Sequence, residues 1–230
     1  MSSKKFDLAS NLEITITKRS SSRRIRLSIT SDGNVRASIP PWLPYKSALD
    51  FAKSKIDWIE SKLPEKVLLT NGRAIGKNHR LIFELTKSTK PTTRLTSIEA
   101  KVFYPANLSI EDDAIQLAAK RIIKKALTKQ AETLLPIRLK QLADQYGYSY
   151  ENVSVKSLKT RWGSCDRLKN ITLNIYLMEL PWPLIDYVLL HELNHTNIMQ
   201  HGPKFWQALE LKLPNYPELK KQLRNYPTYI

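Results

Sequence analysis

Two histidines and a glutamate in the last quarter of the chain have a spacing that suits metal binding. His191 and His195 are four residues apart, so on a helix they project from one face, roughly 40° out of alignment. Two neutral imidazoles in this arrangement suit Zn²⁺, and Glu192 can reach a metal-bound water without filling a coordination position. The H-E-x-x-H pattern therefore predicts a metal site that carries its own base.

A third histidine completes the ligand set if the chain turns back. Continuing the helix to His201 would leave that side chain about 240° from the ligand face. Gly202-Pro203 follows at once, as expected where one helix breaks and another begins. The chain has four histidines, and three of them lie between His191 and His201. Three histidines leave one position on zinc open for water, which is typical of catalytic sites.

The segments around the metal ligands show what must position them. An apolar run, Leu184 to Leu190, follows Pro181-Trp182-Pro183 and predicts a buried helix that begins near Pro183. Residues 153–158 and 171–177 are strand-like and flank residues 160–166. We expect these two strands to form a hairpin that leads into the metal helix.

The rest of the chain predicts an α+β protein. Alternating apolar and polar residues predict strands over residues 12–18, 25–29, 35–39, 79–86 and 94–104. Helical spacing predicts an amphipathic helix over residues 45–62, with Trp58 packed on the sheet, and a long helix from about residue 111 to Tyr146, ended by Gly147. We expect a β-rich amino-terminal domain, residues 1–107, and a metal-binding domain, residues 108–230.

Composition bounds the setting of the protein. The formal net charge is +16, which favours a polyanion such as nucleic acid or a nucleotide as a partner, although a solvated basic surface explains it as well. The stripe from Lys120 to Lys129 is the best candidate for such a contact. Cys165 is the single cysteine, so no internal disulfide forms, and a buried thiol is favoured over a nucleophile. We expect no membrane span and a cytoplasmic location.

The motifs around the histidines resemble one family. They are Arg161-Trp162-Gly163-Ser164-Cys165, Ile171-x-Leu173-Asn174, Ile185-Asp186-Tyr187-Val188, His191-Glu192-x-x-His195, His201 and Phe205-Trp206. Together they look like the YgjP-type metal-dependent hydrolases, which are similar to SprT-like and WLM metallopeptidases. The resemblance extends upstream to the first hairpin and so covers nearly the whole chain.

This resemblance implies a compact zincin-like catalytic domain behind the β-rich domain. It implies His191, His195 and His201 as ligands of one Zn²⁺, or of another divalent metal, with Glu192 as catalyst and a peptide or protein as substrate. Arg161, Asn174 and Tyr187 are candidates for contacts to the substrate or the transition state. The sequence departs from the family pattern at Asn194, where a small residue is common, and at Gln200-His201-Gly202, where Asn-His-Ser is more usual.

Two other functions remain as alternatives at this point. One is a metal-dependent hydrolase of a nucleotide or another phosphorylated substrate, which the cationic excess favours. The other is a nucleic-acid-associated binding protein with a structural metal site. A purely structural site does not need a base at Glu192, so that residue favours an enzyme.

Overall fold

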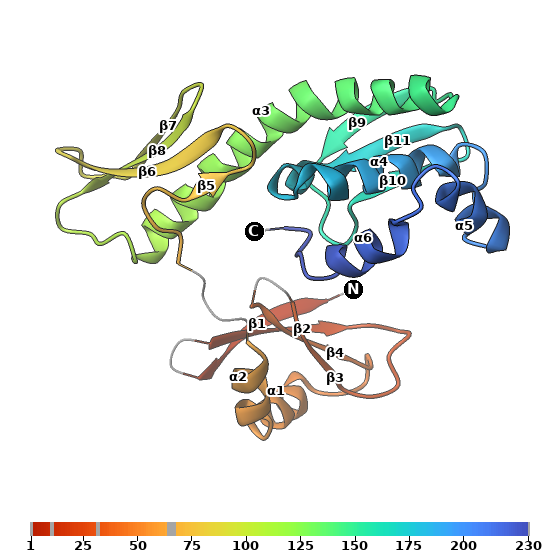
Figure 1. Ribbon diagram of the computed structural model, residues 1–230. Helices are drawn as coiled ribbons and strands as arrows, with labels where there is room; N and C mark the ends of the chain where they lie inside the picture. The colour runs from red at the N-terminus through yellow and green to blue at the C-terminus, as the bar shows by residue number, and fades with distance from the viewer. Residues whose placement is uncertain (1, 10–11, 31–32, 64–67, 230) are drawn as a thin grey trace. The chain divides into compact units, whose positions relative to one another are not determined.

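The chain divides into two compact units. The structure, a computed structural model, describes residues 2–9, 12–30, 33–63 and 68–229. One unit is Met1–Val67 and the other is Leu68–Ile230 (Figure 1). The units thus divide at 67/68, not at the boundary of 107/108 that the sequence predicted. Residues 68–107 group with the second unit because their strands pack on its long helix.

The first unit is a four-stranded sheet with two helices. Its strands are β1 (Ser3–Ala9), β2 (Leu12–Lys18), β3 (Arg26–Ile29) and β4 (Val35–Ile39), in the order β1-β2-β4-β3. β2 and β4 are parallel, and the two outer pairs are antiparallel. Ile14, Ile16 and Ile39 are fully buried in its core. The strands predicted in this region are confirmed, and β1 was missed.

The predicted helix over residues 45–62 is two helices, α1 (Tyr45–Lys53) and α2 (Ile56–Lys62). Neither proline nor glycine lies at the break, at Ser54-Lys55, so no helix-breaking residue indicates it. The second helix buries Ile59 completely, whereas Trp58 is 43% exposed. The prediction that Trp58 packs on the sheet was wrong, because α2 turns the neighbouring isoleucine inward instead.

The second unit begins with a sheet of the same design. Its strands are β5 (Ala74–Ile75), β6 (His79–Thr86), β7 (Thr92–Leu95) and β8 (Glu99–Pro105), in the order β5-β6-β8-β7. Here too the central pair is parallel and the outer pairs are antiparallel. The single strand predicted over 94–104 is in fact β7 and β8. A turn separates them, in which the backbone N–H of Glu99 donates to the Thr96 hydroxyl.

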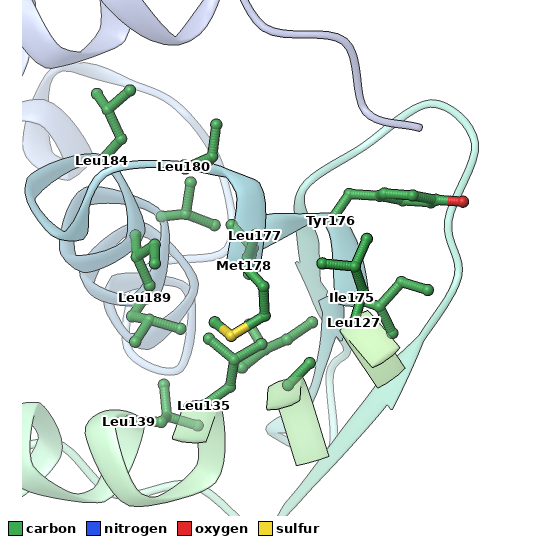
Figure 2. Close-up of a cluster of buried hydrophobic side chains, with 14 of the residues drawn as sticks. Leu127, Leu135, Leu139, Ile175, Tyr176, Leu177, Met178, Leu180, Leu184 and Leu189 are labelled. Atoms are coloured by element: carbon green, nitrogen blue, oxygen red, sulfur yellow. The ribbon is translucent and has the colours of Figure 1, made fainter. Parts of the chain in front are cut away.

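Helix α3 (Asp113–Tyr146) joins this sheet to the rest of the unit (Figure 1). It packs on β7 and β8 of this sheet and also on β9, a 3-10 helix and α4. Gly147, with φ 68°, ends it in the left-handed conformation. Figure 2 shows Leu127, Leu135 and Leu139 of α3 in one apolar cluster with side chains from the other elements.

A second, smaller sheet leads into the metal helix. It contains β9 (Asn152–Lys156), β10 (Gly163–Cys165) and β11 (Asn170–Asn174), in the order β10-β11-β9. The strands predicted at 153–158 and 171–177 do not form a hairpin with each other, since β9 and β11 are parallel neighbours. The hairpin is formed by β10 and β11, with β10 inside the segment that the prediction treated as a connection.

Four helical segments follow this sheet. They are a 3-10 helix (Ile175–Glu179), α4 (Trp182–His195), α5 (Pro203–Glu210) and α6 (Tyr216–Leu223). Met178 of the 3-10 helix, together with Leu184 and Leu189 of α4, belongs to the cluster around α3 (Figure 2). In the described part of the chain, no helix is both long and apolar enough to cross a membrane.

The turn between β5 and β6 connects the larger sheet, through hydrogen bonds, to α3 and to the 3-10 helix before α4. The backbone N–H of Gly76 donates to Glu179 Oε1 (2.9 Å), and that of Lys77 donates to Gln130 Oε1 (2.6 Å). Gln130, on α3, returns a hydrogen bond from Nε2 to the Ile75 carbonyl (3.0 Å). A Cβ atom at Gly76 would lie 2.4 Å from Gln130 Oε1. Glycine is therefore required here by contact as well as by its φ of 58°.

We expect Gly76→Ala to lower the free energy of unfolding more than Gly72→Ala does. Both glycines have positive φ (58° and 82°), but a Cβ at Gly72 would meet nothing within 4 Å. Both variants lose about 1–2 kcal/mol from backbone strain, and the contact with Gln130 adds about 1–3 kcal/mol at Gly76 alone. Urea unfolding of the two variants measures the difference. Equal destabilisation of the two variants would show that the close approach of Gly76 to Gln130 does not contribute to stability.

Candidate metal centre

Helix α4 carries the first two histidines and the glutamate in a largely buried setting. The helix begins at Trp182, with prolines at and after its amino-terminal cap. His195 is 8% exposed and Glu192 is 5% exposed, while His191 is partly buried. The apolar residues between them pack into the core, so the helix presents only its polar stripe to the site.

The turn after α4 brings His201 back to the other two histidines. The Nε2 atom of His201 lies 3.0 Å from Nε2 of His191 and 3.0 Å from Nε2 of His195. Zn²⁺ binds imidazole nitrogens at about 2.0–2.1 Å, and tetrahedral geometry sets such nitrogens about 3.3 Å apart. Unprotonated nitrogens that face one another at this distance repel, and a shared cation removes the repulsion. The three residues therefore fit a metal ion, as the sequence spacing predicted.

The protonation of these imidazoles also suits a cation. Burial, helped by the other two histidines, lowers the pKa of His191 to about 3, and burial also lowers the pKa of His195. The Nδ1 atom of His195 lies 3.2 Å from the Ile198 carbonyl, so this N–H donates outward and leaves Nε2 free to bind. Nδ1 of His191 is buried without a hydrogen bond in the described part of the chain.

Two aromatic residues of α5 support the histidine cluster. The Phe205 ring is fully buried and lies 4.9, 4.6 and 4.8 Å, between centroids, from the rings of His191, His195 and His201. The Trp206 indole stacks on His201 at 5.5 Å and donates from Nε1 to the His201 carbonyl (3.1 Å). These contacts hold the exposed third histidine in place, a role of Phe205 and Trp206 that the sequence did not predict.

Glycine in β10 makes room for the glutamate. A Cβ atom at Gly163 would lie 2.7 Å from Oε1 of Glu192 and 2.7 Å from its Cγ. The strand backbone thus passes directly against the Glu192 side chain, which follows His191 on α4. An isolated glycine in a strand is the signal that could have revealed this close approach.

The electrostatics of Glu192 follow from its surroundings. Burial raises the pKa of its carboxyl to about 8, and the positive charge of Arg161 acts in the opposite direction. Arg161 is exposed, in the loop before β10. A metal cation bound by the three histidines would favour the ionised carboxylate further. A base with a pKa near neutrality is suited to moving a proton at neutral pH.

Asn174 is placed where it cannot meet a substrate. Its side chain is fully buried, and all its hydrogen-bonding capacity is used inside the protein. Nδ2 lies 2.9, 3.0 and 3.0 Å from the carbonyl oxygens of Leu158, Arg161 and Thr228, and its two hydrogens are shared among these acceptors. Its Oδ1 accepts from the Leu158 and Tyr176 N–H groups (3.3 Å each). The expectation of a substrate contact is therefore replaced by a positioning role for the loop that carries Arg161.

Tyr187 is likewise a supporting residue. It lies one turn before His191 on α4, is 5% exposed, and has its ring 6.1 Å from that imidazole. Burial raises the pKa of its hydroxyl to about 12, so the phenol stays protonated. Of the three residues that the sequence proposed for substrate contact, Arg161 is the one that the structure leaves exposed beside the site.

Asn194 has a clear structural role despite its departure from the family pattern. The side chain is 1% exposed; its Oδ1 accepts from the Tyr148 hydroxyl (2.9 Å) and its Nδ2 donates to the Phe205 carbonyl (2.9 Å). Asn194 therefore ties α4 to the residue beneath the three imidazoles.

The remaining candidates lie outside the metal centre's chemistry. Burial, followed by the charges of Glu192 and Asp166, raises the pKa of the Cys165 thiol to about 11, which disfavours a thiolate nucleophile. The basic stripe on α3 is exposed and, with Leu95, lines an open groove; its cations there are Arg121, Lys124, Lys125 and Lys129.

Two solved structures resemble part of the chain, and both are metallopeptidase zymogens from archaea. Abylysin of Pyrococcus abyssi has 23% identity and a TM-score of 0.37, over 40% of this chain and 93% of its own. Jannalysin of Methanocaldococcus jannaschii has 24% identity and a TM-score of 0.36, over 39% of this chain and 93% of its own. No curated protein matches the chain.

A family model gives the assignment. The model of the YgjP-like metallopeptidase domain matches residues 23–226, which includes all three histidines and most of both compact units. The match confirms the resemblance that the motifs from Arg161 to Trp206 indicated. The chain belongs to the YgjP-like family and is a metal-dependent hydrolase of the metallopeptidase type.

Proposed function

We propose that the protein is a zinc-dependent peptidase in which His191, His195 and His201 bind the metal and Glu192 is the general base. The observation that carries the proposal is the convergence of three imidazole Nε2 atoms, two of them on a helix in which the residue after His191 is a buried glutamate. An all-nitrogen set of neutral imidazoles suits Zn²⁺, although Co²⁺ or another divalent ion can occupy such ligands.

A zinc ion held by three histidines lowers the pKa of water toward about 7 and polarises a carbonyl group. The protein's own contribution to the proton transfers comes from Glu192. Its carboxylate takes a proton from the attacking water and later returns it to the leaving amide nitrogen. The backbone of Gly163 lies against this side chain and limits the positions that it can take.

Arg161 is the side chain that we propose for stabilising charge on the substrate. Its guanidinium is exposed, and its charge already influences Glu192. The carbonyl of Arg161 is held by Asn174, so its backbone position is fixed. A donor aimed at the developing negative charge on a scissile carbonyl contributes about 3–4 kcal/mol to the transition state.

We propose a peptide or protein substrate, because the family is one of metallopeptidases. The alternative of nucleotide hydrolysis rested on net charge, and the basic groove of α3 is not part of the histidine cluster. A structural metal site is disfavoured by the buried carboxylate next to the ligands. Assays with casein peptides and with nucleotides, before and after chelation, separate these functions.

The first prediction concerns the third ligand. Changes to groups that only orient metal ligands weaken binding about 10–100-fold, so we expect His201→Ala to weaken zinc binding by more than about 100-fold. Elemental analysis and chelator competition measure the effect. His79→Gln, which removes the histidine outside the cluster, is the control and should keep the metal. Full occupancy in His201→Ala would remove His201 from the site.

The second prediction separates chemistry from metal binding. Glu192→Gln keeps the size of the side chain but cannot accept a proton, so turnover should fall by about 10²–10⁴-fold with the zinc retained. Peptide hydrolysis and metal content are measured on the same preparation. Glu210→Gln, at the exposed end of α5, should leave both unchanged. Undiminished turnover in Glu192→Gln would contradict the proposed base.

The third prediction tests the close approach of β10. Gly163→Ala places a Cβ atom within 2.7 Å of the Glu192 carboxylate and should displace it. Since a misplaced catalytic group can cost about 10²-fold in rate, we expect kcat to fall by that order while zinc binding persists. Gly202→Ala, where a Cβ would meet nothing within 4 Å, is the matched control. Equal activity of the two variants would show that the strand does not position the base.

A further inference from the structure

Helix α6 places a lysine beside the aromatic support of the histidine cluster. Lys220 Nζ lies 3.8 Å from the centroid of the Trp206 ring, in a cation–π contact. Tyr216, one turn earlier on the same helix, stacks on that indole at 5.5 Å with an interplanar angle of 14°. Lys220 and Tyr216 of α6 therefore both contact the Trp206 indole, and the cation–π contact restrains the lysine side chain.

The indole connects this lysine to the histidines. Trp206 stacks on His201, and its ring centroid lies 5.9 Å from that of His191. Lys220 is thus one aromatic ring away from the cluster.

The Lys220 ammonium group lacks a carboxylate partner in the part of the chain that the structure describes. Among residues 2–9, 12–30, 33–63 and 68–229, no ion pair includes Lys220. Arg138 in the same unit shows the contrast, because its guanidinium donates to both oxygens of Asp186 (2.7 and 2.6 Å). A cation kept next to a site for a dication is electrostatically unfavourable unless an anion joins them. A cation–π contact leaves the ammonium N–H groups able to bind such an anion.

We propose that Lys220 forms a subsite for a carboxylate of the peptide substrate, next to the metal centre. The ligand chemistry is a single carboxylate, which an Asp or Glu side chain or the carboxyl terminus of a peptide can supply. This inference rests on the proposed peptidase function and adds to it a preference for acidic substrates.

The test compares peptide binding by matched lysine variants. Calorimetry measures the Kd of short alanine-based peptides for the zinc-loaded Glu192→Gln protein, which binds substrate without turning it over. One set of peptides carries a single glutamate at each position in turn, with blocked termini, and a second set carries glutamine instead. A third peptide has no acidic side chain and a free carboxyl terminus, so the sets distinguish the two sources of carboxylate.

We expect one acidic peptide to bind about ten-fold more tightly than its neutral counterpart, as a charge-assisted hydrogen bond predicts. Lys220→Met should abolish this preference, and Lys220→Arg should restore most of it. Lys221→Met removes the same charge from an exposed neighbour on α6 and should leave the preference intact. Methionine at position 220 keeps an apolar side chain of similar length against the Trp206 indole. Circular dichroism checks that the Lys220→Met protein is folded.

Three results of the binding comparison would overturn the subsite. They are no preference for any acidic peptide, a preference that survives Lys220→Met, and an equal loss in Lys221→Met, which would indicate net charge alone. Cleavage of acidic and neutral peptides at equal rates by the unmodified protein would also reject it and leave the peptidase function standing. Failure to cleave any peptide would count against the peptidase function, while the binding comparison still decides the role of Lys220.

Discussion

The burial of the Glu192 carboxylate, on the helix that carries two of the three imidazoles, is the constraint on which the candidate site depends. An ionisable group removed from water is unfavourable as a charge, and the raised pKa of Glu192 is the direct expression of that cost. The surrounding structure compensates in stages. A glycine backbone leaves space for the side chain, an exposed arginine supplies positive charge, and a buried phenylalanine keeps the imidazoles together.

Helix α3 supports the elements that carry the site residues, because it packs on both sheets of the second unit. Its buried residues run from Ile115 to Ala143, so one continuous apolar face serves two sheets. The turn at Gly76 binds both this helix and the 3-10 helix that leads into α4. The larger sheet therefore braces the elements that carry the ligands, although none of its residues lies in the histidine cluster.

The parts of the site that sequence could predict are those set by local spacing. The histidine pair on α4, the break before His201 and the end of α3 at Gly147 all follow from helix geometry and from glycine and proline. The roles of Phe205, Gly163 and Asn174 depend on contacts between segments that are distant in the sequence. Local spacing and composition do not show which residues of such segments meet. The role predicted for Asn174 was wrong for this reason. The sequence does not show whether an asparagine side chain near a site contacts the substrate or the protein backbone. The domain boundary was misplaced because two sheets of the same strand order follow one another and share a β-rich composition.

The stacking of Trp206 on His201 also makes the centre optically visible. Indole emission responds to the charge and polarity of groups in contact with the ring, and this indole touches both an imidazole of the cluster and the Lys220 ammonium. The chain has five tryptophans, and Trp206 is the one in ring contact with the cluster histidines in the described part of the chain. Arrival of a metal ion or of an anionic ligand would therefore change the fluorescence of a built-in reporter, without any label.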